Sequence, residues 1–224
     1  MIDTLDWWQK PRRINVVVDN PSWIVPFAEH LVSELRLGGD DAVFVCSHEQ
    51  ISVGAVAFYL GCMHVTPPDV LARSRRNLVV HESDLPKGRG FSPMTWQILE
   101  GAKRIPVCLL EAVESVDAGP VIYRDAIVFE GHELVDELRS KLGDKTQSLC
   151  RRFLAEQMPP VGEPQVGAGT FYARRRPADS QLDPARTIVD QFDLLRVVDN
   201  ERYPAWFQHR GNKYKLAIEK MPED

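Results

Sequence analysis

The sequence lacks the features that mark several classes of protein. Its longest apolar runs, such as Ile105–Leu110, fall far short of the roughly 20 residues of a membrane-spanning helix. Its 224 residues hold 27 Lys and Arg against 32 Asp and Glu, so the basic excess of a dedicated nucleic-acid-binding protein is missing. Residues 1–6 show no basic stretch before an apolar run, so we predict no secretion signal. These features favour a cytoplasmic protein that binds neither membrane nor nucleic acid.

Cysteine is also scarce. The four cysteines, Cys46, Cys62, Cys108 and Cys150, are widely separated and stand in apolar surroundings, so we expect reduced thiols. Two of them form Cys-x-His pairs with His48 and His64, and residues two apart on a strand share a face. Because apolar strands flank both pairs, we predict no metal site.

Apolar periodicity predicts an α/β fold. Continuous apolar and β-branched runs predict buried strands over 13–19, 42–46, 77–81, 105–110 and 121–129. Apolar residues at helical spacing predict helices over about 24–35, 93–100 and 133–157, the last with a bend at Gly143. Alternating strands and helices are typical of βαβ units, so we expect a Rossmann-like, mostly parallel sheet flanked by helices.

A segment rich in Pro and Gly divides the chain. We predict a main domain over 1–157, a linker over 158–169 and a small C-terminal extension over 170–224. Within the extension we expect a helix near Ala185–Val198 and a hairpin around Gly211-Asn212.

One polar loop stands out against this background. His81 ends a predicted strand and is followed by a loop rich in Gly and Pro, while Asp117 stands in an Asp-x-Gly turn after the next strand of the sheet. Ligands of open α/β sheets bind beyond the carboxyl ends of the strands. We therefore expect two adjacent parallel strands to bring the imidazole and the carboxylate to one edge. A carboxylate fixes the tautomer of a neighbouring histidine, which prepares the ring for proton transfer.

The stretch His81–Pro93 resembles the signature of the formyltransferases that use N10-formyltetrahydrofolate. The matching positions are His81, Ser83, Leu85, Pro86, Arg89, Gly90, Pro93, Trp96, Asp117 and Gly119. The resemblance covers roughly residues 14–157, and makes 1–157 the catalytic domain. It continues more weakly through Arg174–Asp183 and Phe192–Phe207, which resemble the C-terminal part of the sugar N-formyltransferases. It implies an enzyme that needs no metal and passes a formyl group from N10-formyltetrahydrofolate to an amine.

The resemblance also implies roles for individual residues. It implies a catalytic group made of His81, Asp117 and Ser83. It implies that the folate is bound by Arg89, Gly90, Glu111, Val113 and Asp117. For the acceptor we predict Asn20, Trp23 and Lys87. Asn20 and Trp23 stand in the loop before the first helix, where the helix N-terminus can hold a phosphate.

Val79 departs from the family pattern, because it stands where the family has its catalytic asparagine. In the family this asparagine and the histidine are thought to hold the formyl oxygen, and losing one such donor typically costs roughly 10²–10³ in rate. Asn77 is the nearest asparagine, but four residues of strand separate it from His81 by about 13 Å. A backbone N–H, Ser83 or a water can substitute, or activity is low or lost. Because the Leu85–Gly90 loop is retained, we favour substitution.

The class of acceptor is predicted from the size of the C-terminal extension and from the net negative charge of the chain. We predict a nucleotide-linked amino sugar used in surface glycans, such as the O-antigen of lipopolysaccharide or a nonulosonic acid, and a homodimeric enzyme. Enzymes that formylate methionyl-tRNA carry a larger, basic C-terminal barrel, and an acidic chain binds phosphate backbones weakly. Glycinamide ribonucleotide enzymes usually lack such a tail. Three other readings stay open: a methionyl-tRNA formyltransferase-like enzyme, a folate- or nucleotide-sugar-binding relative without catalysis, and a hydrolase that releases formate from formyl-folate.

Overall fold

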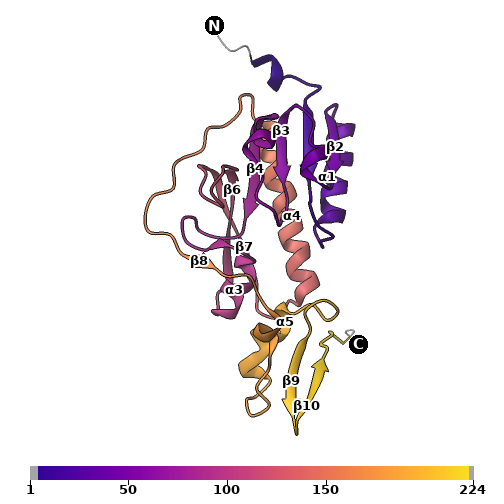
Figure 1. The fold of residues 1–224 in the computed structure, drawn as a ribbon, viewed down its shortest axis with the longest axis vertical. Helices are drawn as coiled ribbons and strands as arrows, with labels where there is room; N and C mark the ends of the chain where they lie inside the picture. Colours follow the sequence, from indigo (N-terminus) through magenta and orange to yellow (C-terminus); the bar gives the residue numbers. More distant parts are fainter. Residues whose placement is uncertain (1–4, 222–224) are drawn as a thin grey trace.

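A six-stranded sheet forms the centre of the computed structural model, which describes residues 5–221 (Figure 1). Its order is β2-β1-β3-β4-β6-β7, with β2, β1, β3 and β4 parallel and with β6 and β7 antiparallel at one edge. The strands are β1 (Arg13–Val17), β2 (Asp41–Val45), β3 (Gly54–Tyr59), β4 (Ser74–His81), β6 (Arg104–Glu111) and β7 (Val121–Val128). The predicted α/β fold with a mostly parallel sheet is confirmed.

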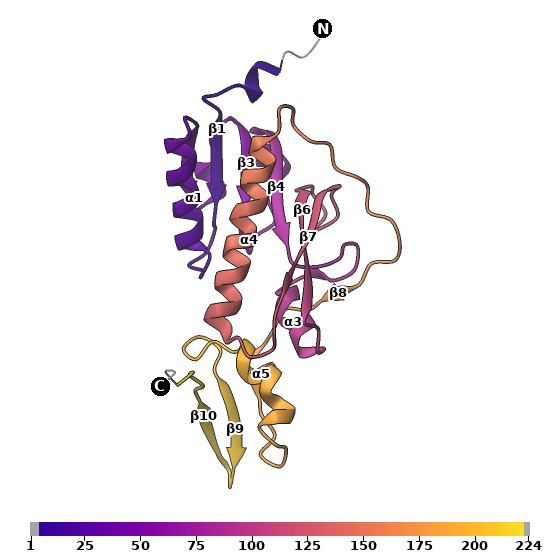
Figure 2. The ribbon, with the colours of Figure 1, turned by 180° about the vertical axis from the view of Figure 1, so that it is seen from behind.

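Helices α1 (Val25–Leu37) and α4 (Val135–Ala155) cover the same face of the sheet (Figure 2). Their buried residues recur at helical spacing, as in Leu31 and Leu35 of α1, and pack with the strands into the largest apolar cluster. Shorter elements are α2 (Pro68–Leu71), α3 (Pro93–Leu99) and the 3-10 turns η1 (Leu5–Trp8) and η2 (His48–Gln50). Within residues 5–221, every helix is too short or too polar to cross a bilayer. The predicted absence of a secretion signal concerns residues 1–6, of which 1–4 lie outside the described range.

Gly143 has a packing role. Helix α4 continues through this position without interruption, where we predicted a bend. A Cβ atom at residue 143 would lie 2.4 Å from the ring of Phe27 on α1. The glycine therefore lets the two helices approach closely on the covered face of the sheet.

Strand β6 runs opposite to the expected direction. It pairs antiparallel with β4, so that His81 faces Cys108 and Leu78 faces Glu111. The connection 82–103 carries the short strand β5 (Arg89–Gly90) and the seven-residue helix α3. After it the chain re-enters the sheet from the end at which it left. The expectation of two parallel strands is wrong, and the loop 112–120 must turn back to bring Asp117 toward His81.

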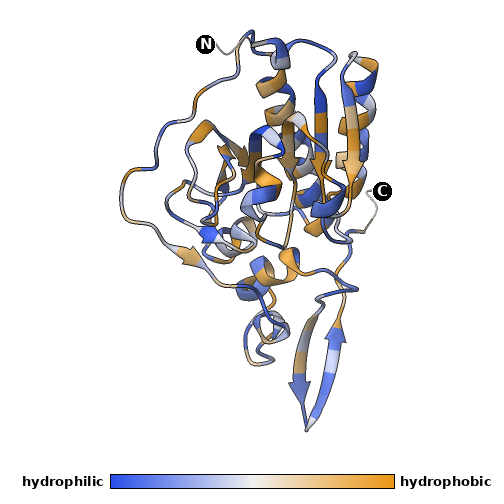
Figure 3. Cartoon of the chain, turned by 45° about the horizontal axis from the view of Figure 1, so that its top comes forward, coloured by the Kyte–Doolittle hydropathy of each residue, from blue (hydrophilic) through white to orange (hydrophobic). Residues whose placement is uncertain are grey.

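The chain after α4 returns to the sheet before it forms the extension. A long segment runs past the edge of the sheet (Figure 1), and β8 (Phe171–Tyr172) then pairs with β5 (Arg89–Gly90). The turns η3 (Pro177–Ser180) and η4 (Val189–Gln191) and the helix α5 (Phe192–Val197) follow. The predicted helix thus begins later than expected. The predicted hairpin is confirmed as β9 (Ala205–His209) and β10 (Asn212–Leu216), and the latter is mainly hydrophilic (Figure 3).

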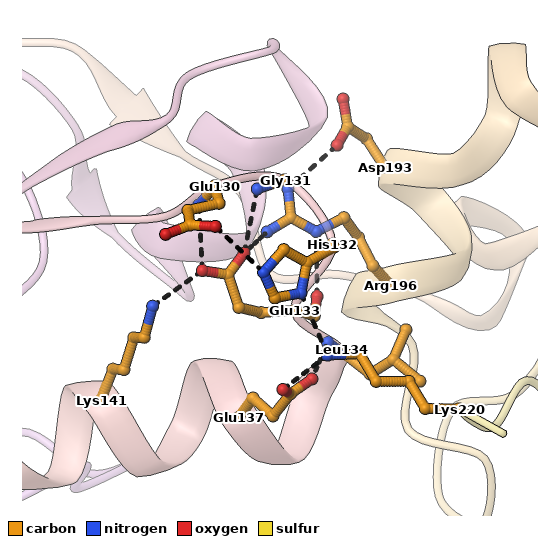
Figure 4. Close-up of polar contacts among 10 residues, drawn as sticks. All are labelled: Glu130, Gly131, His132, Glu133, Leu134, Glu137, Lys141, Asp193, Arg196 and Lys220. Atoms are coloured by element: carbon orange, nitrogen blue, oxygen red, sulfur yellow. Dashed lines mark hydrogen bonds and ion pairs between the residues drawn. The ribbon is translucent and has the colours of Figure 1, made fainter. Parts of the chain in front are cut away.

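A buried ion pair joins the extension to the start of α4 (Figure 4). Arg196 of α5 and Glu133 each expose 2% of their side chains, and Nη2 of Arg196 lies 3.1 Å from Oε2 of Glu133. The Glu133 carboxylate also accepts hydrogen bonds from the backbone N–H groups of Glu130 and Gly131, and from Lys141. This network fixes the position of α5 against the main domain.

Candidate active site

A cavity of about 610 Å³ lies beyond the carboxyl ends of β1, β3 and β4. Its walls come from both the main domain and the extension. Seven of the predicted site residues line it, namely Asn20, Trp23, His81, Gly90, Glu111, Val113 and Asp117. The other three, Ser83, Lys87 and Arg89, lie in the neighbouring loop and do not line the cavity.

The side chains of His81 and Asp117 meet at the cavity wall. Nδ1 of His81 lies 3.5 Å from Oδ1 of Asp117, and both side chains are about nine-tenths buried. Nε2 of His81 lies 2.8 Å from the carbonyl oxygen of Gly88. Because a carbonyl can only accept, Nε2 carries a proton, and Asp117 is placed to accept a second one from Nδ1 in the charged form of the ring. Both ring nitrogens of His81 are thus directed at protein groups at the cavity wall.

The loop between β4 and α3 is held by the segment that contains β8. The backbone N–H of Gly88 donates to Oγ1 of Thr170 over 2.8 Å, and the N–H of Arg89 donates to the carbonyl of the same residue. The rings of Trp96 and Tyr172 stack beside this contact. The carbonyl that binds His81 is therefore positioned by residues 80 or more positions later in the chain.

Gln165 holds the loop that carries Asp117, and no motif or periodicity predicts this role. Its amide nitrogen donates to the carbonyls of Asp117 and Gly119 over 2.7 and 2.8 Å, and its oxygen accepts from Arg89. The Asp117 carboxylate itself accepts from the N–H of Gly90 over 2.8 Å. Gln165 stands in the stretch predicted as a linker, where no periodicity or motif marks it.

The three predicted residues outside the cavity differ in their surroundings. Ser83 is 2% exposed, and its hydroxyl finds no hydrogen-bond partner among residues 5–221. Arg89 points toward Gln165, 2.6 Å from its amide oxygen. Lys87 is exposed on the loop. These positions place Arg89 behind the cavity wall, and Lys87 outside the cavity.

Asp19 fixes the loop that carries Asn20 and Trp23. Its buried carboxylate accepts hydrogen bonds from the N–H groups of Met63 and His64, and from the side chain of Asn20. Burial raises the pKa of Asp19, but the hydrogen bonds from Asn20, Met63 and His64 outweigh it and hold the pKa below its usual value. Asp19 thereby joins the loop that follows β1 to the loop that follows β3, and both loops line the cavity.

The Cys-x-His pairs make other contacts. Nδ1 of His64 lies 2.9 Å from the Asp19 carboxylate, and Sγ of Cys62 contacts the carbonyl of Val17. Nε2 of His48 contacts the hydroxyl of Thr66. Within the described part of the chain, no group of three or more His, Cys, Asp or Glu residues could hold a metal ion.

Val79 and Asn77 occupy different environments. Val79 lines the cavity, whereas Asn77 lies outside it. The Asn77 amide accepts a hydrogen bond from Tyr59 and donates to the carbonyl of Leu71. Asn77 is therefore engaged elsewhere and does not replace the missing amide, as the strand spacing predicted.

Glu111 is engaged by Arg76, which contacts its carboxylate through both Nε and Nη2. Burial raises the pKa of Glu111, and the contact with Arg76 opposes that rise. Val113, by contrast, is 41% exposed at the mouth of the cavity. Of these two predicted folate contacts, Glu111 thus presents a carboxylate that is already paired.

Five arginines surround the cavity, namely Arg139, Arg174, Arg175, Arg176 and Arg202. Arg139 pairs with Asp199 over 2.9 Å, and Arg202 donates to the carbonyl of Pro21. Arg175 donates to the carbonyl of Asp179. The guanidinium groups of Arg174 and Arg176 make no hydrogen bond or ion pair with residues 5–221, although Arg174 lies over the ring of Phe91. The cavity rim thus carries free positive charge in a chain whose net charge is −5.

Comparison with known proteins decides the family. The family model described as formyl transferase matches residues 38–154, which include His81, Asp117 and most of the sheet. The chain belongs to the formyl transferase family. It is 30% identical over 145 residues to the methionyl-tRNA formyltransferase of Dinoroseobacter shibae, a match that covers 64% of this chain and 48% of that protein. The chain thus spans about half the length of this curated relative.

Solved structures share the fold at low sequence identity. A methionyl-tRNA formyltransferase from Clostridium thermocellum superposes with a TM-score of 0.79 at 18% identity, covering 94% of this chain and 93% of that one. A sugar N-formyltransferase from Shewanella sp. FDAARGOS_354 gives 0.67 at 16% identity, covering 95% and 99%. HypX from Aquifex aeolicus in complex with tetrahydrofolic acid gives 0.73 at 16% identity, covering 93% and 38%. The predicted membership of the formyltransferase family is confirmed.

Proposed function

We propose that this chain transfers a formyl group from N10-formyltetrahydrofolate to the amine of a nucleotide-linked amino sugar that is used in surface glycans. The observation that carries the proposal is the pairing of His81 with Asp117 at the wall of a cavity whose rim bears the free guanidinium groups of Arg174 and Arg176. We assign formyl transfer to the His81–Asp117 pair and acceptor binding to the arginines of the rim.

The cavity suits a folate as formyl donor. Its volume lies within the range of roughly 300–1,000 Å³ typical of small-molecule sites. The wall near Asp117 includes the apolar side chains of Val79, Leu110 and Val113, which suit a flat ring system. The tetrahydrofolate bound in the structurally similar HypX supports the same class of donor.

His81 and Asp117 act on the carbonyl of the formyl group. When the acceptor amine attacks the formyl carbon, negative charge grows on the formyl oxygen, and the polar imidazole of His81 at the cavity wall lowers that cost. Asp117 faces Nδ1 of the ring, and the Gly88 carbonyl accepts from Nε2, so the two groups fix the orientation of the imidazole. The C–N10 bond then breaks, and the folate nitrogen takes up a proton as it leaves.

The rim of the cavity favours a phosphorylated acceptor. Arginine guanidinium groups bind phosphate oxygens through paired hydrogen bonds, and those of Arg174 and Arg176 are not engaged by other described residues. A nucleoside diphosphate offers two adjacent phosphates to such a rim. The sugar N-formyltransferase among the structural neighbours is consistent with this acceptor class.

Turnover with a panel of acceptors tests the proposal. We expect formylation of at least one UDP-, GDP- or dTDP-linked amino sugar, and we expect none of the matching hydroxy sugars to react. Loss of formyl-folate absorbance and mass spectrometry of the product measure it. Formate release without an acceptor would instead indicate a hydrolase, and absence of turnover with every amino sugar would overturn the proposed acceptor.

Methionyl-tRNA is the second candidate acceptor. It is favoured by the 30% identity to a methionyl-tRNA formyltransferase, and by the TM-score of 0.79 to another. Charged initiator tRNA therefore belongs in the same panel. If this tRNA is formylated with a higher kcat/KM than any amino sugar, then methionyl-tRNA is the acceptor and the amino-sugar proposal is wrong.

Introducing the family's asparagine tests how the missing amide is compensated. We expect Val79→Asn to raise kcat, because Val79 lines the cavity and an amide there adds a donor to the formyl oxygen. A gain of roughly tenfold to a hundredfold would show that the native site works with one donor fewer. No change would indicate that another group already fills that role. If the native chain binds tetrahydrofolate and only the variant turns over, the chain is a binding protein that has lost catalysis. Val79→Leu, which adds bulk without a donor, is the matched control.

A further inference from the structure

We propose that Glu82 accepts the proton that the acceptor's ammonium group must lose before it can attack the formyl carbon. The inference rests on the proposed function, because it assigns Glu82 to an acceptor that is an amine. It starts from a requirement of the chemistry that the His81 and Asp117 pair does not meet.

The acceptor amine enters with one proton too many. Aliphatic amines have pKa values of about 8 to 10, so at pH 7 roughly nine-tenths or more of such groups are ammonium ions without a lone pair. Attack requires the neutral amine. The nitrogen loses one proton before the new C–N bond forms and a second as the tetrahedral intermediate collapses. The folate nitrogen takes up one proton when the C–N10 bond breaks, and the other needs a base in the cavity.

His81 does not offer a free lone pair to the cavity. Its Nε2 donates a proton to the carbonyl of Gly88 over 2.8 Å, and its Nδ1 faces the Asp117 carboxylate at 3.5 Å. Both ring nitrogens are thus directed at protein groups. This geometry serves charge stabilisation, and leaves the removal of the ammonium proton to another residue.

The other carboxylates that line the cavity have partners. Glu111 contacts Arg76, and Asp199 pairs with Arg139 and accepts from backbone N–H groups. Asp117 accepts from the N–H of Gly90 in addition to facing His81. No group in the described residues other than its own backbone donates to the carboxylate of Glu82, although its carbonyl accepts a hydrogen bond from Gln97. Glu82 is therefore the cavity carboxylate that is available as a base.

Glu82 also has a suitable environment. It follows His81 directly and lines the same cavity. Burial raises its pKa, the charge of His81 opposes that rise, and the charge of Asp117 adds to it. A carboxylate with a raised pKa is closer in proton affinity to an amine, which makes the transfer less uphill. The other charged and titratable groups that the cavity-forming elements present are His64 after β3, Glu111 of β6, Arg139 of α4, Arg174–Arg176 after β8, and Asp199 and Arg202 after α5.

The pH dependence of Glu82→Gln tests the inference, with the panel acceptor that turns over fastest. We expect kcat/KM to fall by roughly 10²–10⁴ at pH 6.5, the range typical of a lost acid–base group. We also expect the deficit to shrink by about tenfold per pH unit until the amine's own pKa, because solution then supplies the neutral amine. A deficit that is constant from pH 6 to 9, or no deficit, would overturn the inference and leave the proposed function standing.

Two further variants keep the test decisive. Asp84→Asn removes a carboxylate two residues away that is exposed and paired with Arg124, so its pH profile should match the wild type. Glu82→Asp keeps a base and should recover part of the low-pH activity, which a merely structural side chain would not do. Tetrahydrofolate binding and thermal unfolding report whether each variant is folded. If the wild type turns over no amino sugar at any pH, the proposed function fails, and the role of Glu82 with it.

Discussion

His81→Ala is expected to lower kcat/KM for formyl transfer by roughly 10²–10⁴ while tetrahydrofolate affinity changes little. The imidazole is the only nitrogen heterocycle that the β4 end presents to the cavity in the described chain, and it is fixed there by Gly88 and Asp117. Steady-state turnover and calorimetric folate binding measure the two quantities. His209→Ala, which removes an exposed histidine of the hairpin, is the control. A residual rate within threefold of the wild type would contradict the assigned role.

Asp117→Asn should show that the two side chains act together. The substitution keeps the size of the side chain and an oxygen for the N–H of Gly90, but removes the charge that faces His81. We expect a loss similar to that of His81→Ala. The double variant should lose little more than either single one, because groups that act as a unit give non-additive losses. Additive losses would mean that Asp117 has a separate task, such as binding the folate.

Glu133→Gln is expected to lower the free energy of unfolding by roughly 3–5 kcal/mol, the cost of breaking a buried ion pair from one side. Arg196 is 2% exposed and would keep its charge with one partner fewer. Urea denaturation of the wild type and the variant gives the difference. Lys141→Met removes the half-exposed partner of the same carboxylate, and should cost about 1 kcal/mol or less. Equal losses in both variants would contradict the special weight of the Arg196 contact.

The same pair makes stability depend on acidity. Burial raises the pKa of Glu133, but hydrogen bonds from Lys141 and from the backbone N–H groups of Glu130 and Gly131 hold it well below its ordinary value of 4.5. Because the folded pKa is the lower one, this stabilisation is present above about pH 4.5 and is lost as the pH falls below it. We expect the unfolding free energy of the wild type to fall more steeply below pH 4.5 than that of Glu133→Gln. Parallel slopes would contradict this.

Local patterns in the sequence predict most of the strands and helices of this fold. The β-branched run at Arg13–Val17 and the leucine spacing of α4 each predict their element, because periodicity reflects burial. The direction of β6, by contrast, cannot be predicted from such local patterns. Nothing in residues 104–111 distinguishes a parallel strand from an antiparallel one, and only the pairing of β6 with β4 in the folded chain shows its direction.

The candidate site was predicted through its motif and missed where it depends on tertiary contacts. His81 and Asp117 were paired correctly in space by a route that the antiparallel β6 shows to be wrong. Gln165 and Thr170 support that pair from a stretch with no periodicity, so only the folded chain reveals them. Lys87 was placed near the acceptor because it stands in the loop, but loop residues can face either way, and this one is exposed away from the cavity.

The pairing of β5 with β8 sets the moment at which the site can be completed on the ribosome. All six strands of the sheet and both covering helices precede residues 165–172 in the chain, so they leave the ribosome before these residues do. Until then the loop after His81 lacks Thr170 and the β8 strand, and the Asp117 loop lacks Gln165. A nascent chain that has not yet released these residues therefore lacks the contacts that position His81 and Asp117. The candidate site is completed only after residues 165–172 have joined the fold.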